Sequence, residues 1–124
     1  MSNSVKEWQT IEVPPSKSSV PWKKSMGIAC PHGREFFLVD GTHIRNTYDS
    51  DWIQGGNGYR YKFCPRRELW IDESMPEEEV GFVAFHECHE TELMAKGMGY
   101  EQAHDRAKRL ENKFRRTHLA LSLR

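Results

Sequence analysis

The sequence predicts an α+β fold in which a small antiparallel sheet of three or four strands precedes two packed C-terminal helices. Short extended runs occur within the first 72 residues, and two long segments with helical spacing of apolar residues follow them. A length of 124 residues is typical of one domain. We expect residues 1–25 to form an N-terminal arm that is partly disordered and residues 26–124 to form the domain.

The first half of the chain contains the predicted strands. The arm contains several prolines and a Ser/Lys cluster, which disfavour regular structure, so we expect at most one short strand there, at Glu7–Val13. Arg34–Val39 is a predicted strand, and Thr42–Arg45 continues in an extended conformation after the pair Asp40-Gly41. An Asp-Gly pair between two such runs predicts a hairpin, because a type I′ turn needs positive φ at both central residues.

Two more strands are expected before the helices begin. The glycine-containing segment Asn46–Gly58 predicts a long loop. Tyr59–Phe63 alternates with period two and predicts a strand, and Glu68–Asp72 predicts another short one.

The second half predicts two helices joined by a short turn. The first is expected from about Pro76 to Lys96, with glutamates in its first turn, where they suit the helix dipole, and glycines after its end. The second is expected from about Tyr100 to Leu119. Its predicted apolar stripe is Ala103, Ala107, Leu110 and Phe114.

Composition excludes several classes of protein. Eighteen Lys+Arg balance eighteen Asp+Glu, so no global field favours nucleic acid, which we do not expect as a partner. No apolar run approaches the roughly 20 residues that span a bilayer, so no membrane association is expected. Three cysteines in no framework spacing indicate thiols in a reducing, cytoplasmic compartment. The oligomeric state stays open.

The segment His86-Glu87-Cys88-His89-Glu90 within the first helix contains a candidate metal site. Four residues of helix place His86 and Glu90 about 40° apart on one face, where an imidazole and a carboxylate can hold one ion. Glu87 lies about 100° away, so it can reach a metal-bound water without being a ligand. This is the arrangement of H-E-x-x-H sites, in which the Glu acts as general base.

The third ligand is predicted to be His104 on the second helix. A fold-back after Gly97-Met98-Gly99 brings facing stripes of the two helices together, and the small neighbours Ala103 and Ala107 permit close approach. His86, Glu90 and His104 then form a three-ligand site with an open fourth position, and these ligand types favour zinc.

Two alternatives remain open from the residues. His89 is spaced three residues from His86 and competes with Glu90 as a ligand. The pair Glu101 and His104 also matches the Glu-x-x-His spacing of di-iron carboxylate bundles. Such bundles need four core helices, and this chain offers two.

These residues, together with Glu68–Asp72 and the Gly99-Tyr100 and Ala103-His104 pairs, resemble small zincin-like metallopeptidases of the kind found in phage and prophage genomes. The resemblance covers roughly residues 34–116. It implies metal binding at His86 and His104, a general base at Glu87, and a minimal zincin-like fold in which Glu68–Asp72 is the edge strand beside the site. One departure is Glu90, which stands where H-E-x-x-H peptidases carry a second His.

Two functions follow from this reading. The first is a zinc-dependent hydrolase that acts on a peptide or protein substrate. The second is a non-catalytic protein of phage type that keeps the zincin scaffold and binds or inhibits a protein partner. Stoichiometric zinc with an open coordination position would favour the first, and a protein without metal would favour the second.

Overall fold

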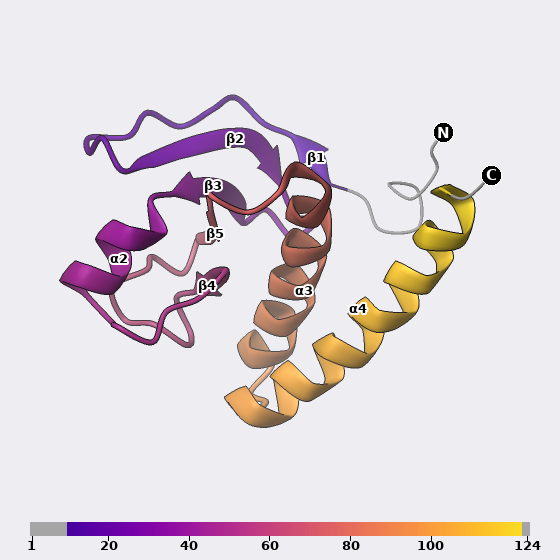
Figure 1. Cartoon of the computed structure of the whole chain (residues 1–124). Helices are drawn as coiled ribbons and strands as arrows, with labels where there is room; N and C mark the ends of the chain where they lie inside the picture. The colour runs from indigo at the N-terminus through magenta and orange to yellow at the C-terminus, as the bar shows by residue number, and fades with distance from the viewer. Residues whose placement is uncertain (1–9, 123–124) are drawn as a thin grey trace.

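The computed structural model describes residues 10–122 and confirms the α+β arrangement, a five-stranded sheet followed by two C-terminal helices (Figure 1). No helix within that range is long and apolar enough to cross a membrane. In chain order the elements are β1 (Ile11–Glu12), β2 (Lys23–Ala29), β3 (Glu35–Val39), α2 (Gly41–Thr47), β4 (Gly55–Asn57), β5 (Glu68–Asp72), α3 (Glu77–Ala95) and α4 (Tyr100–Ser122).

The sheet is mixed, with the strand order β1-β2-β3-β5-β4. β3 and β5 run parallel, from the pair Glu35 and Glu68 to the pair Val39 and Asp72, and the other neighbours are antiparallel. The parallel pair departs from the predicted all-antiparallel sheet, because the chain crosses through α2 and β4 before β5. β4 also covers the free side of β5, so the expectation that residues 68–72 form the edge strand was wrong.

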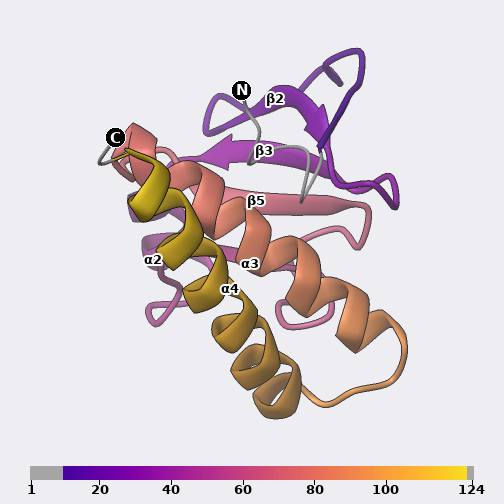
Figure 2. The same cartoon turned by 90° about the vertical axis from the view of Figure 1, so that its right-hand side faces the viewer.

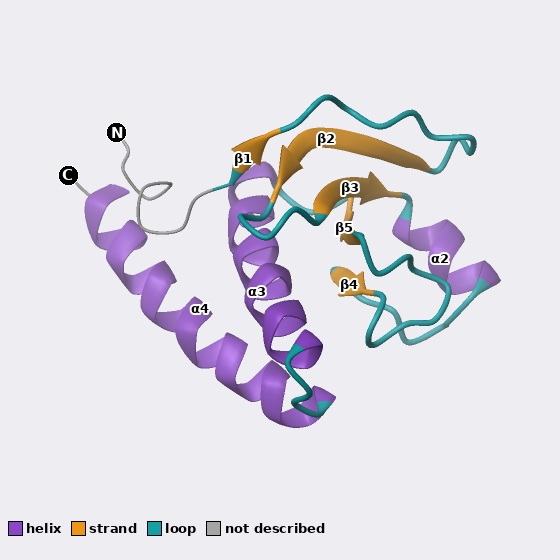
Figure 3. Ribbon diagram, turned by 180° about the vertical axis from the view of Figure 1, so that it is seen from behind, coloured by secondary structure: helices purple, strands orange, loops and turns teal. Residues whose placement is uncertain are grey.

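Alternating side chains give the sheet two buried faces. Phe36, Leu69 and Ile71 pack against α3, whereas Phe37 and Trp70 point to the opposite face. On that face α2 and the segment around β4 cover them. Figure 3 shows this segment as a long connection that is interrupted by the short strand β4. The residues that complete this second cluster are Val39, Ile44, Trp52 and Cys64.

α3 lies in the interior of the fold. α3 lies between the sheet and α4, and α4 runs back along α3 in the opposite direction (Figures 1 and 2). Most of the middle of α3 is therefore buried, including the charged side chains His86, Glu87 and Glu90. Both helices begin and end within three residues of the predicted bounds.

The predicted hairpin at Asp40-Gly41 is a helix start instead. Asp40 is the N-cap of α2, and its Oδ1 accepts the backbone N–H groups of Thr42 at 3.0 Å and His43 at 3.3 Å. Gly41 has no positive φ, but a Cβ at this position would collide with the carboxylate of Asp72. Gly41 therefore allows α2 and β5 to approach each other closely. The hairpin prediction failed because an aspartate such as Asp40 is favoured in turns and at helix N-caps alike.

The predicted strand Tyr59–Phe63 is a series of turns. Asn57 Oδ1 accepts the N–H groups of Tyr59 and Arg60, and Tyr61 N–H donates to the Asn57 carbonyl at 2.9 Å. Local side-chain bonds of this kind compete with strand pairing. The strand in this region is β4, within the predicted loop.

The N-terminal segment contributes more structure than the predicted arm. β2 was not predicted, because Gly27, with φ 71°, and a register shift between Ser25 and Ala29 interrupt its pattern. Of the predicted strand Glu7–Val13, residues 11–12 form β1, and residues 7–9 lie outside the described part of the chain.

The cap of α2 gives a stability prediction. Asp40→Ala should lower the free energy of unfolding by about 1 kcal/mol, because two N–H groups at the helix start lose their acceptor. Urea denaturation followed by circular dichroism measures the change. Asp51→Ala, at an exposed turn position, is the matched control and should change little. An equal loss in both variants would contradict the assigned cap.

Candidate metal centre

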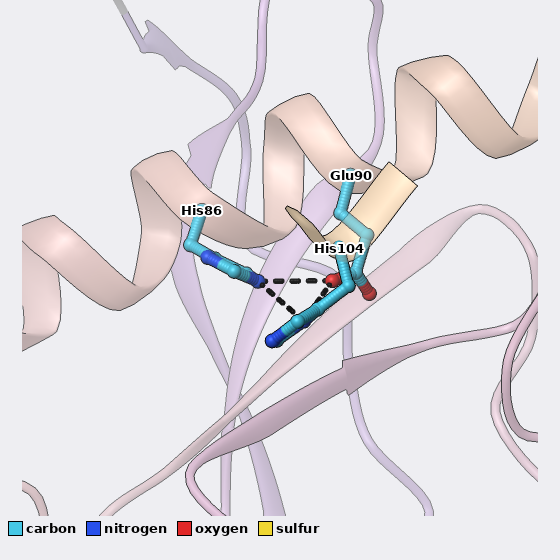
Figure 4. Close-up of side chains that lie close together, drawn as sticks. All are labelled: His86, Glu90 and His104. Carbon is cyan, nitrogen blue, oxygen red and sulfur yellow. Dashed lines mark hydrogen bonds and ion pairs between the residues drawn. The ribbon is translucent and has the colours of Figure 1, made fainter. Parts of the chain in front are cut away.

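His86 and Glu90 of α3 and His104 of α4 converge on one point (Figure 4). His86 Nε2 lies 2.9 Å from Glu90 Oε2 and 3.2 Å from His104 Nδ1, and the last two atoms are 2.8 Å apart. The structure thus brings together the three residues that the spacing singled out as ligands. Glu90 is almost fully buried, whereas the His104 side chain is 46% exposed and leaves the cluster open to solvent on one side.

The turn between the helices and two alanines set this convergence. The α3 C-terminus closes with hydrogen bonds from Gly97 N–H to Met94 O and from Met98 N–H to Leu93 O. Ala103 and Ala107 are fully buried against α3. Because these side chains are methyl groups, the two helices approach closely enough for side chains from both to share one ion.

Glu111 of α4 holds His86 from behind. His86 Nδ1 donates to Glu111 Oε1 at 2.9 Å, which leaves Nε2 facing Glu90 and His104. Glu111 Oε2 accepts from Arg115 Nε at 2.6 Å, and Arg115 also forms two bonds to Glu79 at the start of α3. A carboxylate on the rear nitrogen fixes the ring orientation of metal-binding histidines in proteins.

Glu87 lies beside the cluster and is connected to it through β4. Asn57 Nδ2 contacts Glu90 Oε1 at 3.2 Å and Glu87 Oε1 at 3.5 Å. Both carboxylates are buried, and burial together with the negative charge of Glu90 raises the pKa of Glu87 to about 8. In the metal-free protein Glu87 therefore holds a proton at neutral pH, and a cation at the neighbouring cluster would lower its pKa and free the carboxylate.

The charge state of His86 depends on its two carboxylate partners. Burial disfavours the imidazolium, but the hydrogen bonds to Glu111 and Glu90 outweigh it and raise the pKa of His86 to about 9. Burial opposes ionisation of Glu111 too, and His86 and Arg115 lower the pKa of Glu111 to about 2. In the metal-free protein His86 therefore carries a proton, and this positive charge offsets the neighbouring carboxylates. A bound cation would replace the proton and supply the positive charge instead.

A cavity of about 230 Å³ opens beside these side chains. Its lining includes Glu87, the three clustered residues, Gly55 and Gly56 of β4, and the preceding Ile53 and Gln54. The remaining lining includes the side chains of Arg60, Tyr61, Tyr100, Lys108 and Glu111.

His89 does not join the cluster. Its Nδ1 bonds to the Phe85 carbonyl at 2.8 Å and its ring packs on Phe85, with ring centroids 4.1 Å apart. Glu101 is exposed, and the described residues contain no second Glu-x-x-His helix pair, so the di-iron alternative finds no support. Cys30, Cys64 and Cys88 are buried and form no disulfide.

Two residues of the site escaped the sequence analysis. The predicted buried stripe of the second helix included Leu110, but Leu110 is 40% exposed and its neighbour Glu111 is buried instead. Glu111 follows His104 by seven positions, or about two helical turns, so the two share a helix face, and this spacing was the available signal. Asn57 lies in the predicted loop, and no local pattern marks it.

The donor geometry fits a tetrahedral cation. With zinc–ligand distances near 2.0–2.1 Å, tetrahedral donors lie about 3.3 Å apart. The donor separations of 2.8 to 3.2 Å in the cluster need an expansion of only a few tenths of an ångström. Two imidazoles and one carboxylate also form a donor set that catalytic zinc sites use.

No protein-family model, curated protein or solved structure matches the chain.

The ligand set predicts which variants lose metal. His86→Ala and His104→Ala should abolish stoichiometric zinc after loading and desalting, measured by elemental analysis. His89→Ala is the matched histidine control and should keep it. Glu111→Gln should weaken zinc affinity by about 10–100-fold, because only the orienting bond changes. If His89→Ala loses zinc while Glu90→Ala keeps it, the ligand assignment is wrong.

The raised pKa values predict that the metal-free protein loses stability as pH rises. The pKa of His86 is about 9 in the folded state and 6.5 in the unfolded chain, so its contribution is complete below pH 6.5 and is lost through pH 9. Glu87, with a pKa raised from 4.5 to about 8, acts in the same direction. Between pH 6 and pH 9 the His86 contribution should fall by about 3 kcal/mol.

Urea denaturation of chelator-treated protein at the two pH values measures this loss, and NMR titration should show one histidine titrating near pH 9. A metal-free protein that is equally stable at both pH values would contradict the assigned pairing.

Proposed function

We propose that the chain is a zinc-dependent hydrolase that acts on peptide bonds, with Glu87 as general base. The observation that carries the proposal is the convergence of His86, Glu90 and His104 on one point, with Glu111 behind His86 and Glu87 in the same cavity. The resemblance to zincin-like metallopeptidases supports the peptide substrate.

Zinc bound at such a site lowers the pKa of a coordinated water to about 7 and polarises a carbonyl group. The protein's part is to hold the ligands and to accept a proton. Glu87 is suited to the second task because its carboxylate is buried beside the cluster and contacts Asn57, and because a cation held by the three ligands would lower its raised pKa and ionise it. Asn57 bonds to both Glu87 and Glu90 and so fixes the base relative to the ligand.

The cavity mouth supplies groups that can orient a substrate. Tyr61 and Tyr100 line it, and the Arg60 guanidinium lies 3.9 Å from the centre of the Tyr100 ring. A tyrosine hydroxyl or this guanidinium can donate to a carbonyl oxygen that gains negative charge. Gly55 and Gly56 of β4 also line this cavity.

A binding protein that keeps the scaffold is the second candidate. The observation in its favour is the size of the cavity, because about 230 Å³ is below the 300–1,000 Å³ usual for small-molecule sites. In that case the ion would join α3 to α4, and the protein partner would contact the surface around it.

Glu87→Gln separates the two functions. This variant should fold, bind one zinc and lose peptide hydrolysis by about 10²–10⁴-fold, because glutamine keeps the shape of the side chain but cannot accept the proton. The assay follows cleavage of denatured casein and of a mixed library of quenched fluorescent peptides by the zinc-loaded protein.

Glu73→Gln, at an exposed position outside the cavity, is the matched control and should keep full activity. Loss of zinc in Glu87→Gln would make Glu87 a ligand and overturn the assignment. If the zinc-loaded wild type cleaves neither substrate, the binding function is favoured.

A further inference from the structure

A second cavity, of about 380 Å³, lies between the β2–β3 turn and the segment that precedes β5. It shares no lining residue with the metal centre. Three of its six lining residues are arginines, and the full set is His32, Gly33, Arg34, Tyr59, Arg66 and Arg67.

The parallel pairing of β3 with β5 places these arginines together. Arg34 precedes β3, and Arg66 and Arg67 precede β5, so equivalent ends of two neighbouring strands each carry basic side chains. Glu35 N–H donates to the Arg67 carbonyl at 3.0 Å, and Arg34 Nε donates to the Arg66 carbonyl at 3.2 Å. Because Arg34 and Arg66 are more than thirty residues apart in the sequence, no local pattern predicts this cluster.

The positive charge at this cavity is only partly compensated. Arg34 pairs with Glu92 at 2.9 Å, and the same carboxylate lies 3.6 Å from His32 Nδ1. Neither Arg66 nor Arg67 forms an ion pair with a residue in the range 10–117.

The acidic residues that follow Arg34 and Arg67 in the sequence, Glu35 and Glu68, form their contacts elsewhere. Glu68 accepts from Lys23 and Trp70, and Glu35 accepts from Ser16 and Ser25. Two guanidinium groups at the cavity are therefore left without a carboxylate partner in the described part of the chain.

Tyr59 orients two of the guanidinium groups. Arg66 lies over its ring, 4.4 Å from the centroid, and the Arg34 guanidinium is 5.7 Å from it. The Tyr59 backbone is in turn fixed by its 2.9 Å bond to Asn57 Oδ1. A guanidinium that lies over a ring keeps its N–H groups directed outward from the ring, where an anion can accept them.

We propose that this cavity binds a phosphate group, either as inorganic phosphate or as a phosphate monoester. Two uncompensated guanidinium groups match the double negative charge of a phosphate, and its tetrahedral oxygens can accept from several donors on different elements. A single carboxylate offers one negative charge and two oxygens, so it would use less of this cluster. The site does not depend on the metal centre or on the proposed hydrolase activity.

Phosphate titration at pH 7, followed by backbone amide NMR signals, tests the site. The full chain is kept metal-free with chelator, and sodium chloride holds the ionic strength constant. We expect saturable shifts at Gly33, Tyr59 and Arg66. Arg66→Ala should weaken phosphate binding by at least about tenfold, because hydrogen bonds to charged groups are lost. The phosphate affinity of Arg66→Lys should lie between those of the wild type and Arg66→Ala, since lysine keeps the charge but loses the planar fork of the guanidinium group.

Arg106→Ala is the matched control, because Arg106 is an exposed α4 arginine outside both cavities. His104→Ala should bind phosphate as the wild type does, which separates this site from the metal centre. Parallel titrations with phosphoserine and a nucleoside 5′-monophosphate identify the source. Binding equal to that of inorganic phosphate indicates recognition of the phosphate alone, and tighter binding indicates a monoester ligand.

Three results would overturn the proposal. The first is shifts that do not saturate or that sodium chloride reproduces. The second is an equal loss of affinity in Arg66→Ala and Arg106→Ala. The third is shifts confined to the residues around His104.

Discussion

The hydrogen bond between His86 Nδ1 and Glu111 is the contact on which both the helix pair and the candidate site depend. It joins the middle of α3 to the middle of α4 across a buried interface and continues through Arg115 to the first turn of α3. Three carboxylates, Glu87, Glu90 and Glu111, are buried in this region, and uncompensated burial of charge is costly. Positive charge at the cluster is therefore a condition of the fold, and either a proton on His86 or a cation can meet it.

This condition explains why the fold places α3 at its centre. A helix with one solvated face could leave its acidic side chains in water, but α3 contacts the sheet on one side and α4 on the other. The sheet side of α3 is apolar, with Val83, Ala84 and Cys88 against β3 and β5. The polar side chains can then lie only toward β4 and α4, which is where partners for them are found.

Asn57 links the two cavities of the molecule. Its amide nitrogen contacts Glu87 and Glu90 in the metal centre, and its amide oxygen caps the turn that carries Tyr59 and Arg60. Tyr59 orients the arginine cluster, whereas Arg60 lies over Tyr100 at the mouth of the other cavity. One buried side chain thus contacts two carboxylates of the metal centre and the turn that carries Tyr59, a lining residue of the proposed phosphate site. A change at Asn57 is expected to affect both.

The sequence alone determined the features that local periodicity encodes. The two helices, the strands at Glu35–Val39 and Glu68–Asp72, and the shared face of His86 and Glu90 follow from spacing along a single element. The position of His104 opposite them follows from the short turn that joins the two helices. Only the tertiary structure decided what depends on contacts between distant segments. The parallel partner of β3, the choice of Asp40 as a helix cap, the role of Glu111 behind His86, and the meeting of Arg34 with Arg66 depend on which elements lie side by side. Local propensity carries no information on such neighbours, because the same residues satisfy a turn, a cap or a buried ion pair according to what packs against them.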